Sequence, residues 1–75
     1  MQYYNYTIVI EPDEDAFHAY APALRGCHSC GDTYQEAKDN IKEAIELYLE
    51  SLLDHNEEIP IEQTPFIVER IAVGV

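Results

Sequence analysis

The longest uninterrupted pattern in the chain is that of an amphipathic helix, which we predict from Gly31 to Asn56. Thr33 can cap the start of this helix, and Glu36 three positions later completes a capping-box pattern. Apolar residues then recur at steps of three and four, which places them on one stripe. The stripe comprises Ala37, Ile41, Ala44, Ile45, Tyr48, Leu49, Leu52 and Leu53. Asn56 suits the end of the helix. Because the stripe is apolar, the short segments outside the helix must supply the surface that covers it.

The residues before the helix predict three short β-strands. Tyr, Thr, Ile and Val dominate Tyr3–Glu11, and Ala16–Ala21 is short, aromatic and alternating. Between them, Pro12 and four acidic residues predict a turn. A third strand is predicted at Cys27–Cys30, before the chain turns into the helix. These strands are expected to form an antiparallel meander.

After the helix, a linker leads to a last apolar segment, Phe66–Val75, which we predict as a fourth strand. The predicted order is therefore β-β-β-α-β, an α+β fold in which one long helix covers one face of a single sheet. A right-handed crossover would place the last strand parallel to the first and beside it. We expect residues 1–75 to form a single domain.

Composition adds an expectation about assembly. A chain of 75 residues that is 47% hydrophobic and contains six tyrosines has more apolar surface than a small lone core can hide. One helix also covers only one face of the sheet. Both observations favour a homo-oligomer, either a dimer or a tetramer.

Charge limits the choice of partner. Fifteen acidic residues against four basic ones give a net charge of −11, which argues against direct binding to nucleic acid or to acidic lipid. A basic protein is the complementary partner, and the alternative is that the charge only keeps the protein in solution. We find no signal peptide and no apolar run of transmembrane length, and we therefore predict a cytoplasmic protein with reduced cysteines.

Residues with catalytic or metal-binding potential are present but poorly arranged. Cys27 and Cys30 have a metal or redox spacing, yet only one such pair exists, and in an extended segment the two side chains point to opposite faces. The acidic residues of the turn diverge and lack an enclosing pocket that would shift a pKa. His28 and Ser29 are strand neighbours that face apart. We expect no catalytic residue, no metal and no cofactor.

Acidic residues gather in two places that a cationic partner could contact. On the helix they recur at steps of three and four, where like charges repel one another. This set comprises Glu43, Glu46, Glu50 and Asp54. The second set lies in the first turn and comprises Asp13, Glu14 and Asp15. We predict both sets as partner-binding residues, the alternative being a solvated acidic face.

Several stretches of the sequence resemble the HicB-like antitoxin family of bacterial and archaeal toxin–antitoxin modules. The stretches are IEPDED, AYAPALRGC, GDTYQEAKDNIKEAIELYLE and EEIP, and they span about residues 8 to 60. The most specific part joins Pro22-x-x-x-Gly26-Cys27 to Gly31-Asp32-Thr33 and to the helix pattern EA-x-x-N-x-K-EAI-x-x-Y. One departure is Ala16-Phe17-His18, where family members often have Gly-Gly-Tyr.

The resemblance implies a partly degraded ribonuclease H-like fold that lacks the catalytic carboxylates. It also implies dimers or higher oligomers and a role in neutralising HicA, a small basic RNA-cleaving toxin. Many relatives append a DNA-binding segment, whereas this sequence stops at Val75, so we expect no direct operator binding. The alternatives are a stand-alone oligomeric scaffold or small-ligand-binding protein without a toxin, and an enzyme that uses Cys27, Cys30 and His28.

Overall fold

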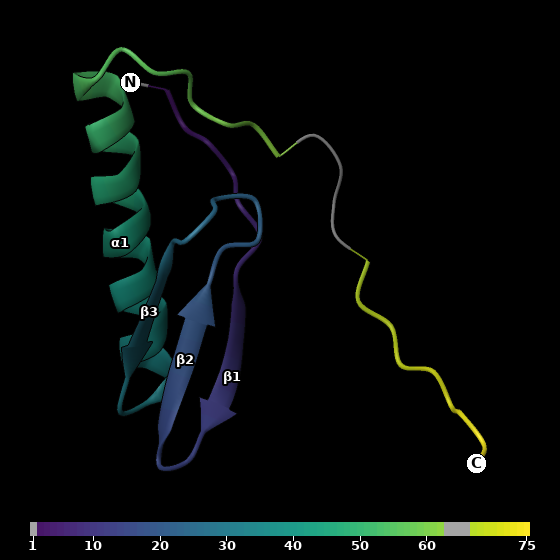
Figure 1. Ribbon diagram of the computed structural model, residues 1–75. Helices are drawn as coiled ribbons and strands as arrows, with labels where there is room; N and C mark the ends of the chain where they lie inside the picture. Colours follow the sequence, from purple (N-terminus) through teal and green to yellow (C-terminus); the bar gives the residue numbers. More distant parts are fainter. Residues whose placement is uncertain (1, 63–66) are drawn as a thin grey trace.

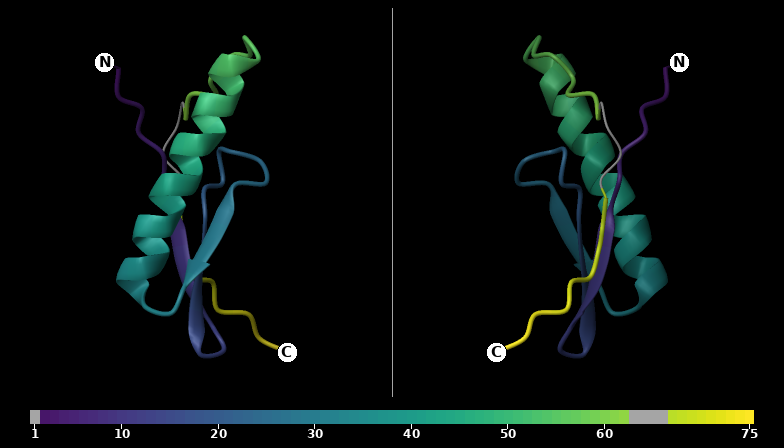
Figure 2. Two further views of the ribbon diagram at one scale, coloured as in Figure 1. Left: turned by 90° about the vertical axis from the view of Figure 1, so that its left-hand side faces the viewer. Right: turned by 90° about the vertical axis from the view of Figure 1, so that its right-hand side faces the viewer.

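A computed structural model of the chain describes residues 2–62 and 67–75 and shows an α+β fold. Three strands precede one long helix, which lies along one face of the sheet (Figures 1 and 2). The elements are β1 (Val9–Asp13), β2 (Ala16–Tyr20), β3 (His28–Gly31) and α1 (Tyr34–Asp54). In this part of the chain, no helix combines the length and the apolar character needed to cross a bilayer.

The sheet is an antiparallel meander with the strand order β1-β2-β3. Its register pairs Val9 with Tyr20 and Tyr20 with His28. The predicted first strand, residues 3–11, is wrong at both ends, because β1 begins at Val9 and continues to Asp13. The chain turns away at Ala21 and Pro22, so β2 offers no residue beyond Tyr20 to pair with the chain before Val9.

The predicted helix is confirmed, including its start. Thr33 has an extended backbone, and its hydroxyl oxygen accepts a hydrogen bond from the Glu36 backbone N–H at 3.1 Å. At the other end Asn56 has φ of 55°. The N–H groups of Asn56 and Glu57 donate to the carbonyls of Leu53 and Leu52, at 3.1 and 2.8 Å, which is the Schellman pattern of helix termination. Both ends are therefore fixed by the residues beside them.

The core lies between β2, the loop after it, and the first half of α1. Its buried members are Ala19, Ala21, Leu24, Cys27, Ala37 and Ile41. Partly buried residues from β1 and from later turns of α1 surround them, among them Ile10 and Tyr48. The predicted apolar stripe of the helix is confirmed through Leu52, but Leu53 is wrong, because its side chain is 60% exposed.

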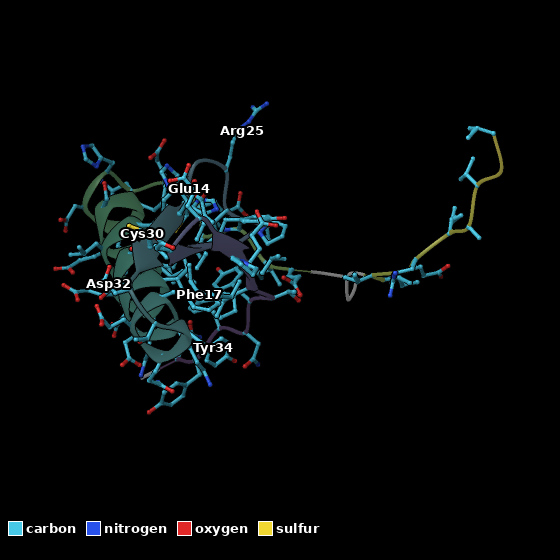
Figure 3. All side chains as sticks on the ribbon, turned by 90° about the horizontal axis from the view of Figure 1, so that it is seen from below. Glu14, Phe17, Arg25, Cys30, Asp32 and Tyr34 are labelled. Atoms are coloured by element: carbon cyan, nitrogen blue, oxygen red, sulfur yellow. The ribbon has the colours of Figure 1, made fainter. Side chains whose placement is uncertain are left out.

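The predicted fourth strand is not found. Over residues 67–75 the chain forms no strand, while Phe66 lies outside the described residues. The segment projects away from the rest of the molecule (Figures 1 and 3), and Ile67, Ile71 and Val73 are 78–81% exposed. A strand needs hydrogen bonds from a neighbour, and a favourable sequence cannot supply them by itself.

Candidate functional site

The residues that carry the family resemblance have structural roles at the junction between β3 and α1. A Cβ atom on Gly31 would lie 2.5 Å from the backbone nitrogen of Ala37, so this position accepts only glycine. Asn40 donates from its side-chain nitrogen to the carbonyl of Cys30 at 2.8 Å, which ties the helix to β3. Together with the Thr33 cap, these contacts define how the helix leaves the sheet.

The first candidate surface is the acidic helix face, which we define as Glu43, Glu46, Glu50 and Asp54. All four side chains are exposed. At 3.6 residues per turn they lie about half a turn from the buried Ile41, on the side of α1 that points away from the sheet. The row extends about 16 Å along the axis at about 1.5 Å per residue. It is therefore a continuous, outward-facing line of carboxylates.

The acidic helix face has no cationic partner in the described residues. Within residues 2–62 and 67–75 the only salt-bridge contact joins His18 Nδ1 to Glu11 Oε1 at 3.9 Å, and it involves no residue of the acidic helix face. The last turn of α1 contains no basic residue, although a helix C-terminus favours positive charge. Glu50 and Asp54 thus place negative charge where the helix dipole opposes it. These carboxylates cost stability within the chain and are available to a cation from outside.

Two exposed leucines flank this face. Leu47 and Leu53 are each 60% exposed, and both are large apolar side chains on a helix that is otherwise polar on its outer side. Leu47 lies four residues after Glu43 and three before Glu50, so it is a direct neighbour of both on the helix surface. The sequence prediction missed Leu47, although its position between the two glutamates was the available signal.

The second predicted set of acidic residues lies elsewhere. Asp13, Glu14 and Asp15 are exposed at the tip of the β1–β2 hairpin, where Glu14 has φ of 58°. Figure 1 shows this tip at the end of the molecule where α1 begins, whereas Glu50 and Asp54 belong to its last turns. The structure therefore places the two sets on different elements, and only the helix set forms a continuous row.

The sheet face opposite α1 carries a small group of titratable and aromatic residues. The His18 ring stacks on Tyr20 with centroids 5.8 Å apart and lies 5.6 Å from the His28 ring. Glu11 completes this group through its contact with His18. In the described residues no group of three or more His, Cys, Asp or Glu side chains is arranged to hold a metal ion.

The two cysteines have different surroundings. Cys27 is buried and Cys30 is exposed, and both are free thiols. Burial raises the pKa of the Cys27 thiol, so Cys27 carries less thiolate at neutral pH than an ordinary cysteine. The expectation that the pair points to opposite sides is confirmed by these exposures, and the arrangement does not bring two sulfur ligands to one point.

A shallow groove near the N-terminus bears on the small-ligand alternative. It is lined by Gln2, Tyr3, Tyr4, Asn5, Ile61 and Glu62. Tyr3 is 85% exposed and Tyr4 is 37% exposed. A ligand held there would remain largely in water, whereas small-molecule sites enclose most of the ligand surface.

The described residues thus form a three-stranded meander covered by a capped helix that carries an outward-facing acidic row. A model of the HicB-like antitoxin of bacterial toxin–antitoxin systems matches residues 6–72. The match covers most of the chain, and the chain belongs to this family.

Curated relatives agree with this assignment. The chain is 53% identical over 75 residues to a UPF0150 protein of Synechocystis, covering 99% of this chain and 92% of the relative. It is 54% identical over 56 residues to a UPF0150 protein of Thermoplasma acidophilum, covering 73% and 81%. A UPF0150 protein of Helicobacter pylori is 59% identical over 44 residues, covering 59% and 61%. A comparison with solved structures gave no significant match.

Proposed function

We propose that this protein is a non-catalytic antitoxin that binds and neutralises a small basic RNA-cleaving toxin of the HicA type in the cytoplasm. The acidic helix face is the proposed contact surface, with Leu47 and Leu53 as its apolar neighbours. The acidic residues of the hairpin tip are a secondary contact. The observation that carries the proposal is the continuous row of four exposed carboxylates, none of which forms an ion pair with a lysine or arginine of the described residues.

The loss of helix stability that these carboxylates cause supports the assignment of the acidic helix face as the contact surface. Like charges at spacings of three and four destabilise a helix by about 0.2–0.5 kcal/mol per pair. Carboxylates near the C-terminus of a helix add an unfavourable interaction with the dipole. A cationic partner would relieve both effects, and the exposed leucines would contribute apolar area. Acidic residues spread evenly over the surface would provide solubility without this local cost.

Neutralisation follows from the same charges. A toxin that cleaves RNA must present cationic groups to phosphates. An acidic helix bound to those groups would compete with the RNA for them and would exclude it sterically. The family resemblance further implies a partly degraded ribonuclease H-like fold, and this finer fold assignment forms part of the proposal.

Titration with a purified HicA-type toxin tests the proposal. The decisive variant is the double substitution Glu46→Gln and Glu50→Gln, which removes two charges from the centre of the row. We expect the dissociation constant to rise about tenfold or more, corresponding to about 1.4 kcal/mol. Binding should also weaken as salt rises, because exposed charges are screened over about 10 Å at 0.1 M ionic strength.

The matched control is Glu57→Gln with Glu58→Gln. These glutamates are exposed, lie just outside the helix and change the net charge by the same amount. We expect this control to bind the toxin almost as the unsubstituted protein does. Equal losses in both double variants would show that net charge, and not the acidic helix face, determines binding. No complex at low salt would contradict toxin binding itself.

A further inference from the structure

Two of the three histidines of the chain lie beside each other on the sheet face opposite α1. His18 belongs to β2 and His28 to β3, and Tyr20, two residues after His18, pairs with His28 in the register. The two histidines are therefore diagonal neighbours across an antiparallel pair of strands, a distance that long side chains can span. Their ring centroids are 5.6 Å apart. The fold thus brings together two imidazoles that lie ten positions apart in the sequence.

The separation of the two rings fits a shared metal ion. Zinc binds an imidazole nitrogen at about 2.0–2.1 Å with tetrahedral angles, which places the centroids of two rings on one ion about 5–6 Å apart. The planes of the His18 and His28 rings are inclined by 48°, so the two rings do not form a parallel stack. The His18 ring also stacks on Tyr20 at a centroid distance of 5.8 Å, which helps to hold it in position. The strands need not move to admit an ion between the two histidines.

Glu11 lies on the other side of His18. The register pairs these two residues across β1 and β2, and Glu11 Oε1 lies 3.9 Å from His18 Nδ1. A metal-binding histidine commonly directs its second ring nitrogen to a carboxylate, which orients the ring and makes the bound nitrogen more basic. The Glu11 side chain is 56% exposed, so a small rotation can bring the two atoms to hydrogen-bond distance. With Nδ1 facing Glu11, Nε2 is the His18 nitrogen available to an ion.

The donor atoms select the class of ion. Imidazole nitrogen suits Zn²⁺, Cu²⁺ and Ni²⁺, whereas Mg²⁺ and Ca²⁺ prefer oxygen ligands. The net charge of −11 favours the approach of any cation. Within residues 2–62 and 67–75 no third His, Cys, Asp or Glu is arranged with the two histidines, so water would complete the coordination. Cys30 is exposed and pairs with His18 in the register, but this arrangement does not make its sulfur a ligand.

We propose that His18 and His28 bind one divalent metal ion of the zinc class on the sheet face opposite α1, and that Glu11 orients the His18 ring. The ion would join β2 to β3 across the sheet. The expectation from the sequence that the chain binds no metal did not take this pair of histidines into account. The site and the acidic helix face lie on opposite sides of the molecule, and the proposal does not depend on toxin binding.

Isothermal titration calorimetry of the full chain with Zn²⁺ is the first test, performed in an excess of Mg²⁺ that occupies weak carboxylate sites. We expect one Zn²⁺ per chain and saturation below millimolar concentration. His18→Gln and His28→Gln should each raise the dissociation constant about tenfold or more, because each removes one of two ligands. Glu11→Gln should raise it by a smaller factor of about three. An unchanged dissociation constant in Glu11→Gln would overturn the role given to that residue.

The matched control is His55→Gln. His55 is the remaining histidine, it is exposed, and its Nδ1 lies 2.7 Å from the Ser51 carbonyl oxygen at the end of α1. This variant should bind Zn²⁺ as the unsubstituted protein does. Cys30→Ser should bind within about threefold, because the thiol is not a ligand. Equal losses in the three histidine variants, loss of binding in Cys30→Ser, or one ion per two chains would overturn the proposal. Helical circular dichroism checks that each variant is folded.

Nuclear magnetic resonance of the unsubstituted chain gives a test that needs no variant. Addition of Zn²⁺ in the same excess of Mg²⁺ should shift the ring signals of His18 and His28 and leave those of His55 in place. Both rings should respond over the same range of Zn²⁺ concentration, because one ion binds both. Shifts confined to carboxylate side chains, or spread equally over the three histidines, would overturn the proposal, because the ion would then bind elsewhere or without selecting this pair.

Discussion

The junction between β3 and α1 and the segment 67–75 form an instructive contrast. Both have clear sequence signals, a capping pattern in one and alternating β-branched residues in the other. At the junction, Gly31, Thr33 and Asn40 each find a contact within ten residues of chain. A strand at residues 67–75 would need hydrogen bonds from a sheet edge that is distant in the sequence. The described structure contains no strand paired with this segment. Local signals therefore determine structure only where the contacts they need are also local.

The largest expected difference between the two regions concerns isoleucine. Ile41 is fully buried and Ile71 is 78% exposed. Ile41→Ala should lower the free energy of unfolding by about 3–4 kcal/mol, because it removes buried methyl groups and leaves a cavity. Ile71→Ala should change it by less than about 0.5 kcal/mol. Urea unfolding, at a concentration where the protein has the mass of one chain, measures both. Similar losses would contradict the contrast.

The next largest effect concerns glycine. Gly31→Ala forces a Cβ atom to within 2.5 Å of the Ala37 nitrogen, whereas a Cβ on Gly74 would meet no atom within 4 Å. We expect Gly31→Ala to destabilise the protein by about 2–3 kcal/mol. Gly74→Ala should leave the unfolding midpoint of the single chain almost unchanged. A tolerated Gly31→Ala would show that the junction can relax.

A smaller effect is expected at the helix cap. Thr33→Ala removes the acceptor of the Glu36 N–H and should cost about 1 kcal/mol. Thr33→Ser keeps the oxygen and should recover most of that loss. Thermal unfolding followed by circular dichroism at the helix band gives the comparison. If serine and alanine behave alike, the hydroxyl is not what stabilises the start of α1.

The smallest effect is chemical rather than energetic. Burial raises the pKa of the Cys27 thiol and shields it, while Cys30 is exposed. At neutral pH, iodoacetamide should modify Cys30 on the order of tenfold faster than Cys27, because the thiolate is the reactive form. Raising the pH should narrow the gap, since more Cys27 thiolate then forms. Mass spectrometry of timed samples measures both rates, and unfolded protein, where the rates should converge, is the control.

What could be predicted from the sequence follows the same division. The helix, its Thr33 start and the presence of a hairpin between the first two strands depend on neighbouring residues and were predicted correctly. The turn itself was predicted too early, because Pro12 lies in β1 opposite Phe17 and the chain turns at Glu14 and Asp15. The start of β1 was predicted too early, because only the register with β2 shows that pairing begins at Val9. Leu53 was assigned to the core, since the three- and four-residue spacing does not show how wide the buried side of the helix is.

The candidate surface was predictable in part. The spacing of Glu43, Glu46, Glu50 and Asp54 already placed them on one side of a helix, and their exposure agrees with that prediction. The sequence alone did not show how far this set lies from the acidic residues of the hairpin, because the distance between two elements depends on the fold. The predicted apolar stripe left Leu47 out, but the sequence analysis assigned this leucine to no surface, and its 60% exposure beside Glu43 and Glu50 became clear only from the fold.

The contacts of Thr7 and Glu62 have a mechanical consequence. Two hydrogen bonds fasten the chain after the helix to the chain before β1, at residues 55 positions apart. A force applied to residues 67–75 would therefore reach the start of β1 at this point before it could reach α1. The helix, with its acidic face, is isolated from such a load by the contacts that Tyr6 and Thr7 make with Pro60 and Glu62.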